Sequence, residues 1–421
     1  MDVDRATLYP YGLIGEKLSH SFSKIIHEKL TDYRYDLIEI PENEIDCFMQ
    51  KREFRAINVT IPYKQTVIPY LDFIDENAKN IGAVNTIVNK KGKLYGYNTD
   101  FAGFLYTLHQ NAISLSDKVV LIMGNGGTCK TVVAVAKSQN AKEIIIASRT
   151  KSEGTLSYDE AINRNDIEVI INASPKGMYP RNDEQPIDLS KFSNLDAVVD
   201  VIYNPLNTRL LQQAKTLGVK YANGLLMLVA QAKFAVEYFL DTKINNDEIN
   251  KIYDEIKASL SNLVLIGMPS CGKTILGEKI ACILNREFVD IDTIITNRSK
   301  MTIEEIFKQK GEDYFRQLEL EVTSEFAKKN SLVISTGGGV IKNNVNILNL
   351  QQNGVIAFID RPIEKLLIGN GRPLSNSSEQ IAKLYQERCQ SYINSSDFTI
   401  CNDTTIEEAL CELEQLFHQT N

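Results

Sequence analysis

The sequence predicts an α/β protein built from two phosphate-binding units. Short apolar runs alternate with stretches of helical period along most of the chain, which is typical of βαβ folds. One such run, residues 119–123, leads into a glycine turn, as in Rossmann-type dinucleotide-binding domains. Another, residues 263–266, leads into GMPSCGKT at 267–274, as in P-loop NTPase-type domains. One domain has little use for two different phosphate loops, so we expect two units in one polypeptide.

The composition is that of a folded protein with an acidic balance. The 421 residues exceed what one hydrophobic core usually serves; 43% are hydrophobic and 24% are charged. The formal net charge of −8 argues against nucleic acid as a partner. The longest apolar runs, such as 225–230, are shorter than a membrane span, and the N-terminal residues lack a secretory pattern. We therefore expect partners that are small molecules, with no membrane and no nucleic acid.

The cysteines and histidines indicate a reducing environment and no structural zinc. The seven cysteines are scattered without a CxxC pair, and only four histidines are present. Reduced thiols in a cytoplasmic protein fit this pattern best. Nothing in the sequence indicates the oligomeric state.

The apolar runs predict two series of strands. In the first series we expect strands over 8–14, 35–40, 56–61, 119–123, 143–147, 168–172 and 197–201, and a long helix over 225–240. In the second series, which begins at Asn262, we expect strands over 263–266, 332–335, 355–359 and 398–400.

The segment between the two series is polar but has a helical apolar period. Ile249, Ile252, Tyr253 and Ile256 predict a helix that closes the first unit, with the joint near 259–262. We therefore predict two domains, 1–257 and 258–421. The first divides into a nucleotide-binding part, 104–224, and a substrate part made of 1–103 and 225–257.

The glycine turn after the 119–123 strand predicts a dinucleotide site. Its bare backbone N–H groups can approach a pyrophosphate at the start of the next helix; the residues concerned are Gly124, Asn125, Gly126, Gly127 and Thr128. The 143–147 strand then ends in Ser148, Arg149 and Thr150. A guanidinium there suits a 2′-phosphate, which favours NADP over NAD, although a solvated surface arginine is the alternative. The second basic residue common after such an arginine is absent, so the selectivity stays open.

Four polar clusters stand at the ends of apolar strands upstream of this turn. They are SHSFS at 19–23, NVTIPYK at 58–64, GAVNT at 82–86 and GYNTD at 96–100. Each could be turn chemistry or helix capping, and Ser19 or Ser21 would suit an N-cap. Each could equally supply donors to a polyhydroxylated ligand.

In order and spacing, these clusters resemble the shikimate dehydrogenase family, whose motifs continue at 171–178, 200–205 and 224–231. The resemblance covers about residues 8–257 and implies a two-domain dehydrogenase that uses NADP(H). It implies that Lys64 and Asp100 form the catalytic pair and that Val201 and Gly224 contact the cofactor. It implies substrate contacts from Ser21, Ser23, Thr60, Asn85, Tyr203 and Gln231.

The chemistry that the family implies explains the need for such a pair. A hydride that reaches a ketone carbon leaves a developing alkoxide, which a nearby ammonium stabilises and can protonate. Asp100 would keep Lys64 charged and aimed. The sequence does not indicate which group finally delivers the proton.

The second glycine loop satisfies the full P-loop pattern between a strand and a helix. Such a loop cradles the phosphates of ATP through its backbone; here the residues are Ser270, Cys271, Gly272, Lys273, Thr274 and Ile275. Lys273 would reach the β- and γ-phosphate oxygens, and Thr274 would supply a hydroxyl to Mg²⁺. Cys271 lies inside the loop, so its alkylation should block nucleotide binding.

The motifs that follow the P-loop resemble the shikimate kinase family over residues 262–402. They are DID at 290–292, FRQLE at 315–319, TGGG at 336–339, RPL at 372–374 and Arg388. The resemblance implies a domain like the nucleoside monophosphate kinases. In it, Asp292 contacts the acceptor hydroxyl and Asp290 orients Mg²⁺. Arg316 and Arg388 would hold a carboxylate, the Gly338 backbone would lie against the ring, and Arg372 would reach the transferring phosphate.

The lid segment, residues 362–373, is shorter than the family's and lacks an arginine before Arg372. We expect a working kinase whose nucleotide binding is weakened, with Lys365 as a possible substitute. The alternative is an active dehydrogenase with a degenerate kinase half that serves as a binding module.

The two implied reactions are consecutive, because the dehydrogenase product, shikimate, is the kinase substrate. Fusion for equal expression is the simpler expectation, and channelling would require suitable geometry. A quinate-type dehydrogenase that uses NAD and a regulator without chemistry remain as rivals. The regulator would leave Lys64 and Asp100 without a purpose.

Overall fold

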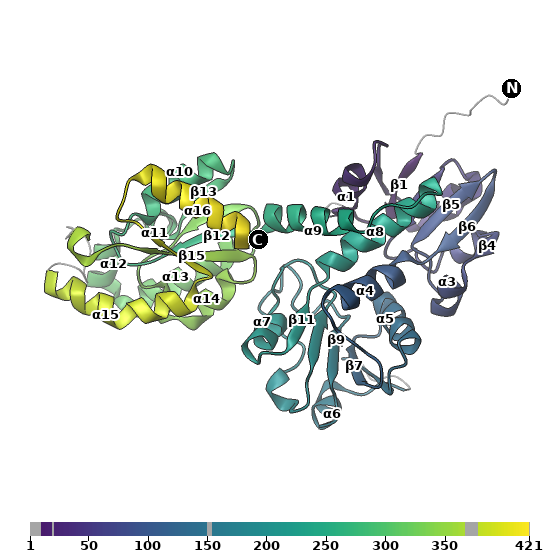
Figure 1. Ribbon diagram of the computed structural model, residues 1–421, viewed down its shortest axis with the longest axis horizontal. Coiled ribbons are helices and arrows are strands. Elements are labelled where there is room, and N and C mark those ends of the chain that lie inside the picture. The colour runs from purple at the N-terminus through teal and green to yellow at the C-terminus, as the bar shows by residue number, and fades with distance from the viewer. Residues whose placement is uncertain (1–9, 19–20, 150–153, 367–377, 421) are drawn as a thin grey trace. The chain divides into compact units, whose positions relative to one another are not determined.

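The computed structural model describes residues 10–18, 21–149, 154–366 and 378–420. The chain divides into two compact units (Figure 1). The first is made of Met1–Lys176, Gln185–Tyr203 and Gln213–Asp254, and the second of Gly177–Glu184, Asn204–Gln212 and Glu255–Asn421. The domain bounds that the sequence predicts are not decided by this division and stay predictions.

A mixed six-stranded sheet forms the N-terminal part of the first unit. Its strands, in spatial order, are β2 (Asp36–Glu39), β1 (Tyr11–Gly15), β3 (Ala56–Val59), β5 (Thr86–Lys90), β6 (Lys93–Tyr97) and β4 (Phe73–Ile74). Its helices are α1 (Ser23–Leu30), η1 (Glu42–Glu44), α2 (Ile45–Lys51), η2 (Ile68–Tyr70) and α3 (Glu76–Ile81).

The β5–β6 hairpin makes this sheet mixed, whereas the sequence pattern predicted parallel units. β5 pairs antiparallel with both β3 and β6. The hairpin turns at Lys91 and Gly92, whose φ values of 54° and 83° lie in the left-handed region. The sequence pattern did not predict this hairpin, because its two strands, TIVNK and KLYGY, are short and partly polar.

The second sheet of the first unit is five-stranded, parallel and Rossmann-like. Its strands, in spatial order, are β11 (Lys220–Ala222), β10 (Ala197–Asp200), β9 (Val169–Asn172), β7 (Val119–Met123) and β8 (Glu143–Ala147). Its helices are α4 (Thr99–Gln110), α5 (Gly127–Ser138), α6 (Tyr158–Ile162) and η3 (Leu189–Lys191). The division between the units falls inside α7 (Arg209–Thr216), after Gln212. Apolar side chains of α4 and α5 pack on β7 and β9 in one buried cluster.

Two long helices complete this part of the chain. α8 (Leu225–Leu240) occupies the predicted residues and packs along α4. α9 (Asp247–Leu260) confirms the helix expected from the spacing of Ile249, Ile252 and Ile256, all of which are buried. Only Ser261 separates α9 from the next strand.

The third sheet is five-stranded and parallel and belongs to the second unit. Its strands, in spatial order, are β13 (Glu287–Asp290), β14 (Leu332–Ser335), β12 (Asn262–Ile266), β15 (Gly354–Asp360) and β16 (Phe398–Cys401). The helices are α10 (Lys273–Ile283), α11 (Ile291–Ser299), α12 (Ile303–Lys310), α13 (Glu312–Ala327), η4 (Val340–Lys342), α14 (Asn344–Leu350), η5 (Ile363–Lys365), α15 (Ser378–Ser395) and α16 (Ile406–Thr420). Figure 1 shows α10 and α16 on one side of this sheet and α14 and α15 on the other.

Most predicted strands are confirmed within two residues of their expected ends, and the strand expected over 8–14 is described from residue 10 onward.

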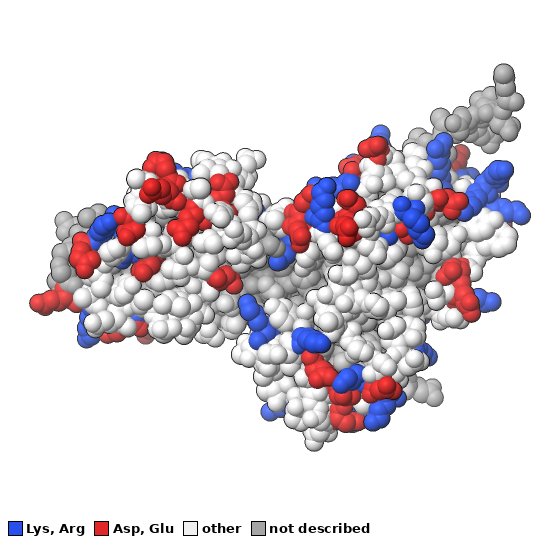
Figure 2. All heavy atoms as spheres, viewed as in Figure 1, with Lys and Arg blue, Asp and Glu red and all other residues white. Residues whose placement is uncertain are grey.

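Within the described residues, no helix combines the length and apolar character needed to cross a bilayer. On the face shown in Figure 2, basic side chains lie beside acidic ones over both units.

Candidate active sites

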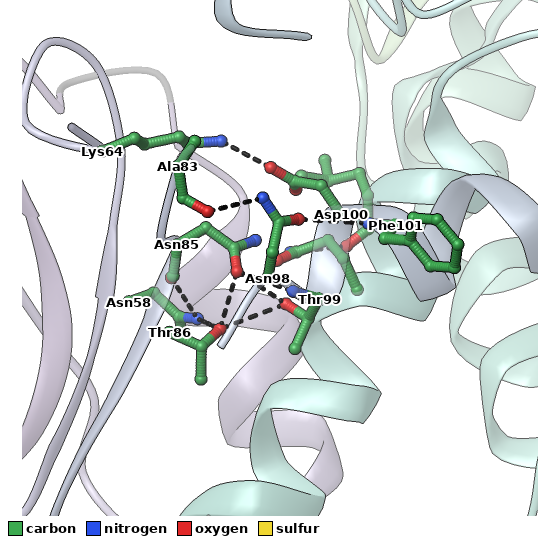
Figure 3. A network of polar contacts seen from close by, with 11 residues as sticks. Asn58, Lys64, Ala83, Asn85, Thr86, Asn98, Thr99, Asp100 and Phe101 are labelled. Carbon is green, nitrogen blue, oxygen red and sulfur yellow. Dashed lines mark hydrogen bonds and ion pairs between the residues drawn. The ribbon is translucent and has the colours of Figure 1, made fainter. Parts of the chain in front are cut away.

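Lys64 and Asp100 form an ion pair at one end of the first sheet. Lys64 follows β3, and Asp100 lies in the first turn of α4. Lys64 Nζ lies 2.6 Å from Asp100 Oδ2, with side-chain exposures of 26% and 16% (Figure 3). The contact is a charge-assisted hydrogen bond between an ammonium and a carboxylate, with the carboxylate at the N-terminal end of α4. The pair is partly shielded yet still open to a ligand.

Asn85 stands next to this pair in a buried polar network. Its side chain is 3% exposed, and its Oδ1 accepts hydrogen bonds from Thr99 N at 2.8 Å and Thr86 Oγ1 at 2.9 Å. Thr99 directly precedes Asp100. The network therefore ties Asn85 to the first turn of the helix that carries Asp100 (Figure 3).

Ser21, Ser23 and Tyr203 form a second group. Ser21 Oγ accepts the N–H of Ser23, the first residue of α1, at 3.2 Å. The intervening Phe22 meets the Tyr203 ring edge-on, with ring centroids 6.0 Å apart. Burial raises the pKa of the Tyr203 phenol, so this group stays a hydrogen-bond donor at neutral pH.

Thr60 and Gln231 lie on other elements of the first unit. Thr60 follows β3, and its Cγ2 lies 2.7 Å from the Cβ position that a side chain at Gly15, the last residue of β1, would take. Gln231 on α8 packs against Gly103 on α4, one turn after Asp100. Thr60 thus lies beside the end of β1, and Gln231 lies against α4, the helix that carries Asp100.

The predicted dinucleotide turn has the expected geometry. Gly124 directly follows β7 and has φ of 106°, Gly126 is the N-cap of α5, and Gly127 and Thr128 lie in the first turn of α5. A Cβ at Gly126 or Gly127 would meet nothing within 4 Å. This bare helix N-terminus fits a pyrophosphate.

The residues after β8 lie at the same edge of the sheet as this turn, because β7 and β8 pair in parallel up to Met123 and Ala147. Ser148 is buried and Arg149 is exposed, whereas Thr150 lies outside the described residues. An exposed guanidinium at this edge fits a 2′-phosphate.

Val201 and Gly224 touch through their backbones. A Cβ at Gly224 would overlap the Val201 carbonyl oxygen, so only glycine fits this approach. Gly224 is the N-cap of α8. The contact thus fixes the start of the helix that carries Gln231.

In the P-loop of the second unit, the Lys273 side chain folds back onto the loop backbone. Lys273 Nζ donates to Gly267 O at 3.0 Å and to Met268 O at 2.9 Å. Cys271 is fully buried within the loop, whereas Ile275 is exposed on α10; Ser270 and Gly272 have φ of 66° and 103°. The burial of Cys271 predicts slow alkylation, because a reagent must first open the loop.

Thr274 and Asp290, the two residues predicted to ligate Mg²⁺, lie in direct contact. Thr274 Oγ1 lies 3.0 Å from Asp290 Oδ2, while Asp290 Oδ1 caps α11 through Thr293 N. Oxygen ligands of this kind fit Mg²⁺. No cluster of three or more histidine, cysteine or acidic side chains that could hold a metal occurs among the residues that the structure describes.

The glycine run 337–339 is the point at which the other kinase-like residues meet. The Cβ position at Gly337 lies 2.7 Å from Asp292 Oδ1, and that at Gly338 lies 2.7 Å from Pro269 Cδ of the P-loop. Arg388 donates to Gly338 O at 2.9 Å, and the Arg316 guanidinium lies against Gly339. Asp292, Arg316 and Arg388 therefore surround one small space beside the P-loop.

Two residues of this space had no predicted role. Glu319 is fully buried and accepts a hydrogen bond from Arg316 at 2.8 Å; burial raises the pKa of its carboxyl, whereas Arg316 lowers it. The FRQLE spacing could have indicated this pair, since residues three apart share a helix face.

Asn402 donates to Cys271 O at 2.7 Å and braces the P-loop. Only the order of strands β12, β15 and β16 brings it there, so the sequence held no local signal for it. Arg372, by contrast, lies outside the described residues.

Two parts of the chain match known families. The family model described as shikimate kinase matches residues 269–417, and that described as shikimate dehydrogenase substrate binding domain matches residues 13–87. Shikimate dehydrogenase (NADP(+)) of Clostridium beijerinckii is 39% identical over 259 residues, which are 58% of this chain and 96% of that protein.

Solved structures match the same part of the chain. Shikimate dehydrogenase 1 from Peptoclostridium difficile is 35% identical with a TM-score of 0.54, covering 59% of this chain and 98% of that one. Shikimate 5-dehydrogenase from Thermus thermophilus, solved in complex with NADP(H) and shikimate, is 26% identical with a TM-score of 0.54, covering 59% and 99%. A chorismate mutase/shikimate 5-dehydrogenase fusion protein from Clostridium acetobutylicum is 36% identical with a TM-score of 0.56, covering 59% and 97%.

Proposed function

The chain belongs to the shikimate dehydrogenase family and carries a shikimate kinase domain, and on that premise we propose that it catalyses two consecutive reactions. The first is the NADPH-dependent reduction of 3-dehydroshikimate to shikimate. The second is the Mg·ATP-dependent phosphorylation of shikimate to shikimate 3-phosphate. The 2.6 Å contact between Lys64 Nζ and Asp100 Oδ2 is the observation that carries the first reaction.

In the dehydrogenase site, Lys64 would face the carbonyl oxygen of the ketone, whose carbon accepts the hydride. NADPH supplies the hydride when bound, and the Lys64 ammonium would stabilise the developing alkoxide and can protonate it. Asp100 holds that ammonium in place through its hydrogen bond. Ser21, Ser23, Thr60, Asn85, Tyr203 and Gln231 would hold the carboxylate and hydroxyls of the substrate.

For the cofactor we propose the turn of Gly124–Thr128 as the pyrophosphate site, with Val201 and Gly224 beside the nicotinamide half. Arg149, at the sheet edge next to this turn, would contact the 2′-phosphate, with Ser148 and Thr150 beside it. This arrangement supports NADP as the preferred cofactor.

In the kinase site, Asp292 would accept the proton of the acceptor hydroxyl, and Arg316 and Arg388 would clamp the carboxylate. Lys273 would leave the carbonyls of Gly267 and Met268 to reach the phosphates. Bound Mg²⁺ neutralises phosphate charge, and Thr274 and Asp290 would hold it. The convergence of Asp292, Arg316 and Arg388 on the 337–339 glycines supports this reaction.

Two finer points stay predictions. A cytoplasmic location is supported by the seven cysteines, all of them free thiols. Nucleic acid and membranes are not expected as partners, given the net charge of −8 and the mixed charges of the face in Figure 2.

A coupled assay on the purified full chain tests the proposal. With 3-dehydroshikimate, NADPH and Mg·ATP, we expect loss of NADPH and release of ADP, each followed separately. NADH and quinate serve as competing cofactor and substrate, and a preference for them would establish the quinate-type alternative. Loss of NADPH without release of ADP would establish a degenerate kinase half.

A further inference from the structure

We propose that Asn58, Thr86 and Thr99 are positioning residues that lock the Asn85 side-chain amide in one orientation, so that Asn85 serves only as a hydrogen-bond donor to a substrate oxygen. The inference rests on the proposed function, in which Asn85 contacts substrate. It adds to that function a chain of buried contacts that fixes which end of the amide the substrate meets.

The Thr99 backbone fixes the polarity of Asn85. A backbone N–H can only donate, so the amide atom 2.8 Å from Thr99 N is the oxygen. Thr86 Oγ1 at 2.9 Å and Thr99 Oγ1 at 3.2 Å add further contacts to the same oxygen. Since Oδ1 is engaged by Thr99 and Thr86, the amide cannot turn over without burying an unpaired N–H opposite another donor.

Asn58 fixes the direction of the Thr86 hydroxyl. Asn58 stands directly opposite Thr86 across the β3–β5 ladder, and its Nδ2 donates to Asn85 O at 3.2 Å and to Thr86 Oγ1 at 3.1 Å. Its Oδ1 accepts the phenol of Tyr35 at 2.7 Å. Because Thr86 Oγ1 receives a proton from Asn58, its own proton points toward Asn85 Oδ1 or Thr99 Oγ1.

The side-chain N–H₂ of Asn85 is what remains for a ligand. Within the described residues its Nδ2 has no hydrogen-bond partner. The side chains that hydrogen-bond around Asn85 are buried: Tyr35, Asn58, Thr86 and Thr99 are at most 5% exposed. Figure 3 shows Asn85 between Lys64 on one side and Asn58 and Thr86 on the other. A ketone or hydroxyl oxygen can accept from this donor, and a preset donor saves the cost of orienting the amide at binding.

Thr86→Val tests the positioning role in the full chain, because valine keeps the shape of threonine and removes the hydroxyl. We expect the KM for 3-dehydroshikimate to rise about threefold to tenfold, as the loss of one orienting hydrogen bond would cause. The KM for NADPH should not change. Thr86→Ser, which restores the hydroxyl, should return the KM for 3-dehydroshikimate to near the wild-type value.

Thr107→Val is the matched control. Thr107 is also buried, but its hydroxyl bonds to Gly103 O inside α4, away from Asn85. KM does not depend on the fraction of folded enzyme, so a variant that only folds poorly loses kcat at constant KM. An unchanged KM in Thr86→Val, or an equal rise in Thr107→Val, would overturn the inference.

Asn85→Asp tests the donor requirement, because it keeps the acceptor for Thr99 and removes the N–H₂. We expect kcat/KM to fall at least about tenfold, and full activity in this variant would contradict a donor role. Failure of the proposed function is a separate outcome, since wild-type chain would then show no turnover of 3-dehydroshikimate with NADPH.

Discussion

Lys64 and Asp100 lie 36 residues apart in sequence, yet Lys64 Nζ lies 2.6 Å from Asp100 Oδ2. Both residues belong to the proposed dehydrogenase site, so their removal should affect the reduction reaction alone. We expect Lys64→Ala to lower the kcat/KM for 3-dehydroshikimate by about 10²- to 10⁴-fold, since general acid catalysis contributes that much. The kinase rate should not change. Initial rates of NADPH loss and ADP release measure both effects.

Lys24→Ala provides the control for this variant. Lys24 belongs to the same unit and pairs with Glu28 at 3.7 Å on the exposed side of α1. Its removal should leave both rates unchanged. Equal activity of Lys64→Ala and Lys24→Ala would refute the role of Lys64. Absence of turnover in the wild type as well would favour a regulator without chemistry.

His27 is a buried titratable residue that should set part of the pH dependence of stability. It is fully buried, stacks on Tyr35 with ring centroids 4.0 Å apart, and its Nδ1 lies 2.7 Å from Tyr33 Oη. Burial lowers the pKa of His27 from 6.5 to about 3. As the pH falls, His27 is therefore protonated in the unfolded chain before it is protonated in the folded protein. The contribution of neutral His27 to the free energy of unfolding is complete above pH 6.5 and is lost as the pH falls toward 3.

His27→Phe, which keeps a ring against Tyr35, removes this dependence. Between about pH 6.5 and about pH 4.5 the free energy of unfolding of the wild type should fall by about 2 kcal/mol more than that of His27→Phe. Urea unfolding followed by circular dichroism at several pH values measures the difference. Parallel pH profiles of the two proteins would show that His27 is not the titrating group.

At the scale of elements, the start of α8 depends on glycine at position 224. Gly224→Ala should lower the free energy of unfolding by about 1–3 kcal/mol, because its Cβ would overlap the Val201 carbonyl. Gly126→Ala is the matched contrast, since Gly126 has φ of −80° and open space at its Cβ. Gly126→Ala should keep the wild-type Tm and raise the KM for NADPH. A lower Tm in Gly126→Ala together with an unchanged Tm in Gly224→Ala would contradict the structural role of Gly224 and the cofactor role of Gly126.

Local sequence patterns predicted most elements but not all pairings. β7, β8, β14 and α8 have the predicted bounds, because each is a strongly apolar run or a long helical period. The β5–β6 hairpin and the short strand β4 were missed, because their partners decide their pairing more than their own side chains do. Continuous apolar runs and long helical periods are thus what the sequence predicts best.

At the scale of the whole molecule, the two activities should be separable in one chain. Lys273→Ala should abolish release of ADP, since the P-loop lysine carries the charge that meets the phosphates. NADPH-dependent reduction of 3-dehydroshikimate should continue at the wild-type rate. A loss of both activities would show that the two sites depend on each other, and unchanged ADP release would rule out this P-loop as the kinase site.

The sequence by itself determined the kinds of site and the order in which they occur. Gly124–Gly127 and 267–274 have fixed local spacing, and a phosphate loop binds its ligand through residues that are consecutive in sequence. The tertiary structure alone decided what surrounds each site. Asn402 reaches the P-loop across 131 residues, Glu319 and Asp292 meet at Gly337, and Asn58 orients Thr86 across a ladder of two strands. Such contacts depend on the order and register of strands, and these are set by packing of the whole sheet rather than by any one segment.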